Sequence, residues 1–220
     1  TLVAALVEDH RQVSLLKFQG LFLSKIMDLN TSLPDQLPKL RFLDRFMENH
    51  RGYIAGGCFK NLFTGEKIKD VDLFFLNEPD AKEAIAHYSA NKEYKQAWTN
   101  DRVTAFRCQK TQVVVECISS FIGEPETMIG NFDFTITKAF YTKNEAGEYV
   151  FQCHSKFFEH LVNRKLVIDD KVLFPLSTFT RSFRYKGYGF GLCGESKQVL
   201  IQSLQGASVS NINDFYFGLD

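Results

Sequence analysis

Hydrophobic and polar positions follow two different spacings along this chain, and each spacing predicts a different kind of element. Apolar residues recur every three or four positions in VAALVEDHRQVSLLKFQGLFLSKIMDL and, beyond two prolines, in PKLRFLDRFMEN, which predicts amphipathic helices. From Gly52 the spacing changes to short apolar runs between polar turns, which predicts strands. After Ser155 the helical spacing returns in LSTFTRSFRYKGYGF and GESKQVLIQSLQG.

The middle of the chain predicts a strand–helix–strand unit followed by more strands. YIAGG predicts a strand, CFKNLFTG a short helix ending at Gly65, DVDLFFL a buried strand and EPDAKEAIAHYSAN a helix. WTNDRVTAFRCQKTQVVVECISSF predicts two strands, GEPETMIG a loop or short helix, and the following segment a hairpin turning at 144–147. We expect an α+β fold with a small mixed sheet and flanking helices. The expected divisions are N-terminal helices over 1–50, a head over 51–153 and a helical neck-like region over 154–220.

Composition narrows the class of protein. The chain has 220 residues, 45% apolar and 24% charged, which is typical of a soluble globular protein. No apolar run approaches the ~20 residues that span a bilayer, so we expect no membrane association. Five cysteines without a C-x-x-C pair predict reduced thiols and a cytoplasmic location. Basic and acidic residues number 26 each, which argues against nucleic-acid binding over the whole surface but allows a local basic groove. Because the chain starts at Thr1 rather than at a methionine, we expect a trimmed amino terminus.

Two aspartates separated by one residue are the strongest chemical signal. Asp70 and Asp72 lie on the predicted strand DVDLFFL, and residues i and i+2 of a strand point to the same face. Adjacent carboxylates repel each other unless a cation lies between them, and oxygen ligands suit Mg²⁺ or Mn²⁺. Upstream, Gly56 and Gly57 precede a helix whose first amides could bind a phosphate. The alternative is a pair of exposed edge aspartates, which the apolar flanking residues disfavour.

A third carboxylate usually completes a two-metal site. Glu116 is the one charged residue in the apolar strand QVVVECISS, where an unpaired buried carboxylate would be costly. Asp133, in NFDFT, competes for the same role. A structural ion pair is the alternative for Glu116.

The basic candidates lie in two helices. Lys60 follows the glycine pair, where an ammonium group could reach a triphosphate, although a surface lysine is the ordinary outcome. Arg181 and Arg184 are three residues apart and so are expected to share a helix face. Their guanidinium groups could bind phosphate or a base edge in forked geometry, or could form a solvated basic surface.

These motifs together resemble the class II tRNA nucleotidyltransferases and bacterial poly(A) polymerases, members of the polymerase-β-like nucleotidyltransferases. GGCFKNLFTGEKIKDVDL resembles the family's glycine turn, helix and D-x-D motif, and NFDFTITKAF resembles its second motif. RSFRY resembles its arginine-bearing third motif. The resemblance covers about Gly52 to Phe190 and keeps the motif order. It implies Asp70, Asp72 and Glu116 as metal ligands, with Gly56, Gly57, Lys60, Asp133, Arg181 and Arg184 binding the nucleotide.

The chain also departs from that family. The family's Arg-Asp after the glycine pair is Lys60-Asn61, and its Arg-Arg before D-F-T is Asn131-Phe132. The long helical body that follows the third motif and a Glu-Asp-x-x-Arg motif are absent from this sequence. CCA addition is therefore not carried over.

The resulting hypothesis is a Mg²⁺- or Mn²⁺-dependent transfer of NMP from an NTP to an RNA 3′ end, tRNA included, or to another hydroxyl acceptor. Two alternatives stay open: a toxin or phage-type enzyme that modifies tRNA or protein, and a catalytically degenerate nucleotide- or RNA-binding module.

Overall fold

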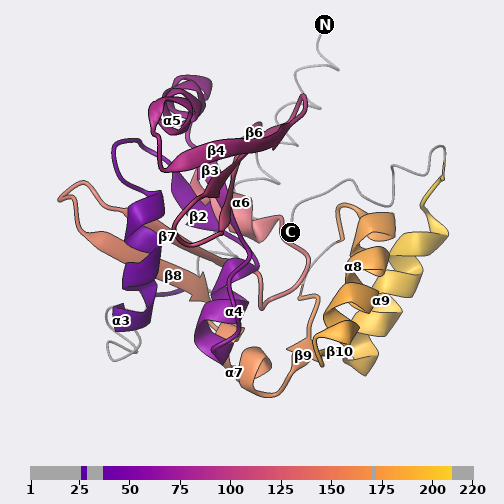
Figure 1. The fold of residues 1–220 in the computed structure, drawn as a ribbon. Helices are drawn as coiled ribbons and strands as arrows, with labels where there is room; N and C mark the ends of the chain where they lie inside the picture. Colours follow the sequence, from indigo (N-terminus) through magenta and orange to yellow (C-terminus); the bar gives the residue numbers. More distant parts are fainter. Residues whose placement is uncertain (1–25, 29–36, 170–171, 210–220) are drawn as a thin grey trace, which may run out of the picture.

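A mixed eight-stranded sheet forms the centre of the protein (Figure 1). The computed structural model describes residues 26–28, 37–169 and 172–209. The strand order is β1-β8-β7-β2-β3-β6-β5-β4, in which β3 and β6 are parallel and the other pairs are antiparallel. The strands are β1 (Ile26–Asp28), β2 (Tyr53–Ala55), β3 (Asp70–Phe75), β4 (Tyr94–Thr99), β5 (Val103–Cys108), β6 (Val114–Ile122), β7 (Ala139–Lys143) and β8 (Tyr149–His154).

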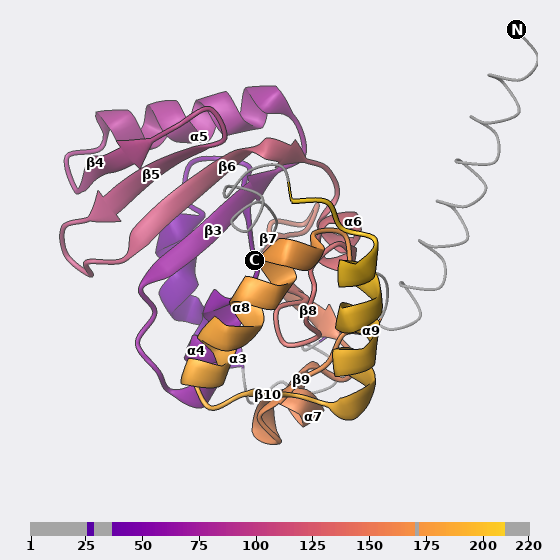
Figure 2. The same ribbon diagram turned by 90° about the vertical axis from the view of Figure 1, so that its right-hand side faces the viewer.

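Helices flank this sheet, and two of them pack together beyond it. The helices are α3 (Leu37–Leu40), the 3₁₀ helix η2 (Arg41–Phe46), α4 (Cys58–Thr64), α5 (Glu78–Ala90), α6 (Pro125–Gly130), α7 (Phe157–Val162), α8 (Pro175–Gly187) and α9 (Gly194–Gln205). Two short parallel strands, β9 (Lys165–Leu166) and β10 (Gly191–Leu192), form a second, two-stranded sheet. Figure 2 shows α8 and α9 side by side, at a distance from β4 and β5. None of the described helices is long and apolar enough to cross a bilayer.

The expected α+β class is confirmed, and local signals explain many of the element boundaries. Helix α4 ends at Gly65, whose φ of 75° is a left-handed conformation that glycine adopts without strain. Helix α5 begins after Asn77, whose side chain accepts a hydrogen bond from the Asp80 amide at 2.9 Å. The predicted hairpin is formed by β7 and β8.

Three sequence predictions need correction. Ile26–Asp28 lies in a segment predicted as helix but forms a strand paired with β8; the rest of that segment lies outside the described residues. Leu37–Phe46 is helical, but only its first turn is α-helix and the remainder is 3₁₀. The segment predicted as two strands contributes three, β4, β5 and β6, so the sheet is larger than expected.

The two faces of the sheet bury different residues. On one face, Phe106 of β5 stacks on Tyr88 of α5 with ring centroids 5.4 Å apart, beside the buried Val115. On the other, Phe74 of β3 belongs to a second core cluster with Phe132. Asp70 and Asp72 alternate with core residues of β3 and share the face of Phe74. The sheet therefore presents these carboxylates on the side opposite α5.

Candidate functional site

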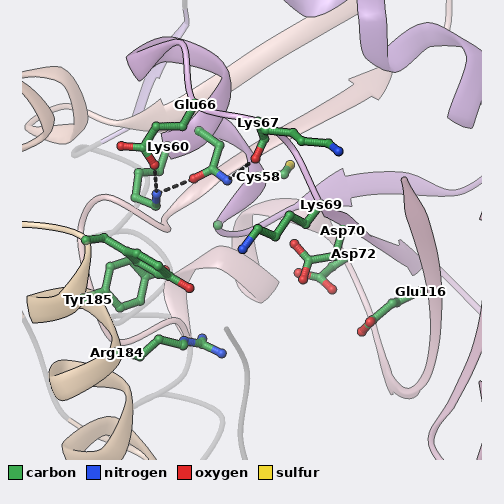
Figure 3. A pocket seen from close by; sticks show the side chains of 13 residues that line it. Cys58, Lys60, Glu66, Lys67, Lys69, Asp70, Asp72, Glu116, Arg184 and Tyr185 are labelled. Carbon is green, nitrogen blue, oxygen red and sulfur yellow. Dashed lines mark hydrogen bonds and ion pairs between the residues drawn. The ribbon is translucent and has the colours of Figure 1, made fainter. Parts of the chain in front are cut away.

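The three predicted carboxylates lie on one face of two adjacent parallel strands. Asp72 of β3 is the register partner of Glu116 of β6, and Asp70 is the partner of Val114. Asp70 is exposed, whereas Asp72 and Glu116 are half-buried. Figure 3 shows the carboxylates of Asp70 and Asp72 side by side, with that of Glu116 apart from them. The structure thus forms the expected aspartate pair and places the third carboxylate on the neighbouring strand.

These carboxylates line a cleft of about 490 Å³ between β3, α4 and α8. The predicted residues Gly57, Lys60 and Arg184 also line it. Three predicted nucleotide-binding residues do not belong to its lining: Gly56, Asp133 and Arg181.

Lys60 is buried and already paired, which rules out the alternative of a surface lysine. Its side chain is 4% exposed, and its Nζ lies 3.0 Å from a carboxylate oxygen of Glu66. It also donates to the side chain of Asn61 and lies 4.8 Å from the ring centroid of Tyr188. The hydrogen bond from Lys60 lowers the pKa of Glu66. Much of the positive charge of Lys60 is therefore balanced within the protein.

The two glycines have different roles. Gly56 has a φ of 100°, and its N–H donates to the Ala139 carbonyl at 3.1 Å, so this amide is used inside the sheet. The Gly56 amide is therefore already engaged and is not available for the predicted phosphate contact. Gly57 lines the cleft, and a Cβ at this position would come within 3.2 Å of the Tyr185 hydroxyl. A small residue allows α4 and α8 to approach closely at this point.

Asp133 and Arg181 form a buried ion pair rather than an open binding surface. Arg181 Nη2 lies 2.6 Å from Asp133 Oδ2, and Arg181 Nε donates to the same oxygen at 2.8 Å. Arg181 also donates to Ser177 of its own helix at 2.7 Å. Arg184, predicted to share a face with Arg181, is instead exposed and lines the cleft. The pair joins α8, which carries Arg184, to the segment between α6 and β7.

Lys67 and Lys69 were not among the predicted site residues, yet both line the cleft and are exposed. Figure 3 shows the Lys69 side chain beside the aspartate pair, extending into the cleft in the direction of Tyr185. Strand alternation gave no signal for them, since a regular strand would place Lys67 and Lys69 on the face of Val71, opposite Asp70 and Asp72. Together with Arg184, they supply positive charge that Lys60 does not.

A second charged cluster was also missed. Buried Lys138 lies 2.8 Å from Asp169 Oδ1, and His154 Nε2 lies 3.0 Å from Asp169 Oδ2. His154 Nδ1 accepts a hydrogen bond from the Lys156 amide, so a neutral ring would carry its proton on Nε2, the nitrogen that lies near Asp169. Burial opposes ionisation of Asp169, but the hydrogen bond from His154 and the charge of Lys138 hold its pKa well below the usual value. This cluster fixes the segment that leads to α8.

The aspartate pair fits a divalent ion better than the full triad does. Mg²⁺ is commonly bound through one or two carboxylates, with water and substrate phosphates as its other ligands. Among the described residues, no group of three or more His, Cys, Asp or Glu side chains is arranged to hold an ion. Burial raises the pKa of the neighbouring Cys58 thiol, and the charges of Asp72 and Asp70 raise it further. The pair therefore creates a negative potential that a cation would relieve.

Solved structures resemble this chain in fold. A CCA-adding enzyme in complex with CTP aligns with a TM-score of 0.55 at 16% identity, covering 82% of this chain and 47% of that one. The Thermotoga maritima CCA-adding enzyme in complex with tRNA aligns with a TM-score of 0.52 at 16% identity, covering 82% and 46%. At such identity the likeness shows the fold alone, which is nucleotidyltransferase-like.

Sequence comparison identifies the family. "Gabija anti-defense 2" of Bacillus phage SPbetaL7 is 28% identical over 141 residues, which cover 63% of this chain and 34% of that protein. The chain thus spans about a third of this relative's length. The model of the Gabija anti-defense 2 family matches residues 17–164, more than half of the chain. The chain belongs to the Gabija anti-defense 2 family.

Proposed function

We propose that this protein is a metal-dependent nucleotidyltransferase that transfers NMP from an NTP to a hydroxyl acceptor and releases pyrophosphate. The observation that carries the proposal is the side-by-side arrangement of Asp70 and Asp72 on a cleft that Lys69 and Arg184 also line. Similarity of fold to CCA-adding enzymes supports it. A cleft lined by both carboxylates and cations suits a substrate whose triphosphate is anionic and whose reacting phosphorus needs a cation.

The residues of the cleft have separate roles in this proposal. Asp70 and Asp72 hold Mg²⁺ or Mn²⁺, which when bound polarises the phosphoryl oxygens and favours a deprotonated acceptor hydroxyl. Lys67, Lys69 and Arg184 bind triphosphate oxygens and orient the leaving pyrophosphate. Glu116 is proposed as the third carboxylate, because its backbone is in register with Asp72.

Asp133 and Arg181 act indirectly in this scheme. Their buried ion pair holds α8 against the sheet, so that Arg184 faces the cleft. We propose that they influence nucleotide affinity through the position of α8 rather than through contact with the base or ribose.

The biological role proposed here follows the name of the family. We propose that the chain acts inside a phage-infected host cell, where it counters a defence system by modifying RNA, tRNA or a protein. The rival is a non-catalytic nucleotide- or RNA-binding module. The pairing of Lys60 with Glu66 favours this rival, because it lowers the charge available to a triphosphate.

Label transfer tests the proposal directly. The protein is incubated with Mg²⁺ and each α-³²P-labelled NTP, in separate reactions with total host RNA and with host protein extract. We expect label on one acceptor class, no label after EDTA treatment and none with Asp70→Asn. Lys82→Ala, which changes an exposed residue of α5 on the other side of the sheet, is the control and should label normally. NTP binding without Mg²⁺ and without label transfer would favour the non-catalytic module.

A further inference from the structure

The sheet face that carries the carboxylates continues across β5 to the edge strand β4. Asp72 pairs with Glu116, Glu116 with Ala105, and Ala105 with Trp98. Residues paired in register point to the same face of a sheet, so Trp98 shares the face of Asp72. Three strand spacings separate them, or about 14 Å at ~4.8 Å per spacing.

A neighbouring row on the same face is basic. Asp70 pairs with Val114, Val114 with Arg107, and Arg107 with Lys95. Like charges directly opposite each other on paired strands are destabilising unless an anion lies between or over them. Within the described part of the chain, no carboxylate forms an ion pair with Lys95 or Arg107.

A β-bulge places Trp98 on this face. Gln96 pairs with Phe106 and Trp98 with Ala105, so the register shifts between Gln96 and Trp98. In a regular strand Gln96 and Trp98 would share a face, which would be the face that α5 covers. The bulge turns Trp98 to the carboxylate side instead.

Trp98, Lys95 and Arg107 form what we call the β4–β5 platform. The Trp98 side chain is 41% exposed, and Lys95 and Arg107 are both exposed. Figure 2 shows β4 and β5 at the end of the sheet that is remote from α8 and α9. Arg107 Nη1 donates to the Gln112 carbonyl at 3.2 Å. The platform therefore combines an accessible aromatic ring with two cations that form no ion pair among the described residues, in continuity with the carboxylates.

We propose that the β4–β5 platform binds the acceptor of the transfer reaction, and that this acceptor is a single-stranded nucleic acid. A base would stack on Trp98 while the adjoining phosphates contact Lys95 and Arg107, and the terminal hydroxyl would lie toward Asp70 and Asp72. Proteins bind single-stranded nucleic acids by combining aromatic rings with cationic side chains. Stacking on a ring requires an exposed base face, which a duplex hides. An acidic protein acceptor would use the cations but would not need the ring. The role of the bound strand as acceptor rests on the proposed nucleotidyl transfer. Binding of the strand to the platform can be tested without transfer.

Trp98 is the single tryptophan of the chain, so its fluorescence reports directly on the platform. Mixed-sequence 15-nucleotide RNA and DNA strands, and the matching duplex, are titrated into the full chain without NTP. We expect quenching of Trp98 by single strands at concentrations where the duplex has little effect, and comparison of RNA with DNA shows which sugar is preferred. Strand binding seen by anisotropy of a labelled strand without quenching of Trp98 would overturn the proposal.

Substitutions separate the ring from the charges. Trp98→Ala should weaken strand binding by about five- to a hundredfold, because stacking of one base on an aromatic ring changes affinity by about that factor. Trp98→Tyr should retain most of the wild-type affinity. Lys95→Ala and Arg107→Ala should each reduce the slope of log affinity against log salt by about 0.7. Phe183→Ala removes another exposed aromatic side chain, on α8, and should leave binding unchanged. Wild-type affinity in Trp98→Ala, or equal losses in Trp98→Ala and Phe183→Ala, would contradict the platform.

The same titration keeps the two proposals apart. Asp72→Asn should bind the strand at least as well as wild type, since it removes a negative charge from the face. If strands bind through Trp98 but no label is transferred, the platform stands and nucleotidyl transfer fails. If label is transferred to protein and no strand binds, the platform fails and nucleotidyl transfer stands.

Discussion

Arg181 of α8 and Asp133, which precedes β7, form a buried ion pair in which both Nη2 and Nε approach Asp133 Oδ2, at 2.6 and 2.8 Å. Both side chains are less than 10% exposed. A charge buried with its partner is tolerated, but a charge left buried alone is costly. The pair therefore couples the position of α8 to the sheet, and with it the position of Arg184 in the cleft.

Breaking this pair should destabilise the protein. We expect Arg181→Ala to lower the free energy of unfolding by about 3–5 kcal/mol, since it leaves the Asp133 carboxylate buried without its guanidinium partner. Urea denaturation measures this change. Arg184→Ala, an exposed position on the same helix, is the control and should change stability by no more than about 0.5 kcal/mol. Similar stability in both variants would mean that the ion pair does not hold α8.

Arg184 should instead affect nucleotide binding. We expect Arg184→Ala to weaken NTP affinity by about ten- to a hundredfold, because a hydrogen bond to a charged group contributes about 1.5–3 kcal/mol. Isothermal titration with a non-hydrolysable NTP analogue and Mg²⁺ gives the affinity. Arg184→Lys should recover only part of it, because an ammonium group lacks forked geometry. Lys186→Ala is the matched control, since Lys186 is exposed on α8 but does not line the cleft. Equal affinities in wild type and Arg184→Ala would remove Arg184 from the site.

The cluster around Asp169 should also be structural. Asp169→Asn removes the carboxylate that compensates buried Lys138 and should lower the free energy of unfolding by about 3 kcal/mol or more. Thermal unfolding of this variant is compared with that of Glu159→Gln, which breaks an exposed ion pair to Lys156. Exposed pairs contribute little, so the control should unfold at nearly the wild-type temperature. A wild-type melting temperature in Asp169→Asn would show that Lys138 does not require this partner.

His50 should make stability depend on pH. Burial lowers the pKa of His50 from 6.5 to about 4, with a further contribution from the charge of His87. Between these two values the unfolded chain binds more protons than the folded one, so the free energy of unfolding falls as the pH is lowered from 6.5 to 4. The expected loss is about 3 kcal/mol at about 1.4 kcal/mol per pKa unit.

Urea denaturation across pH 4–7 measures this dependence. His50 accepts a hydrogen bond from the Gly52 amide at Nδ1, and its Nε2 lies 3.1 Å from the Phe46 carbonyl, which together describe a neutral ring. His50→Gln cannot titrate and should show a shallower slope over this range, after allowance for its lower stability. The same slope in both proteins would assign the dependence to other groups.

Local patterns predicted the parts of the fold that depend on neighbouring residues. The glycine turn, the helix ending at Gly65 and the D-x-D strand were all predictable, because spacing and conformational preference determine them. The pairing of Ile26–Asp28 with β8 was not, since it joins segments more than a hundred residues apart. The division of the chain at residues 50 and 153 stays a prediction.

The candidate site was predictable to the same extent. Strand alternation gave the shared face of Asp70 and Asp72, and an isolated charge in an apolar strand indicated Glu116. The sequence could not show that Lys60 is paired with Glu66, because the chain after α4 turns the Glu66 carboxylate back toward the helix that carries Lys60. Nor could it show that Arg181 is buried on Asp133 while Arg184 faces the cleft, since this depends on how α8 packs.

The most direct test of the central claim is Mg²⁺-dependent label transfer by Asp72→Asn. The account predicts that this variant transfers no detectable label from any α-³²P NTP to host RNA or protein, while wild type labels one of them. Its stability should equal or slightly exceed that of wild type without metal, because removing one of two adjacent negative charges relieves repulsion. Label transfer by Asp72→Asn at the wild-type rate would contradict the account.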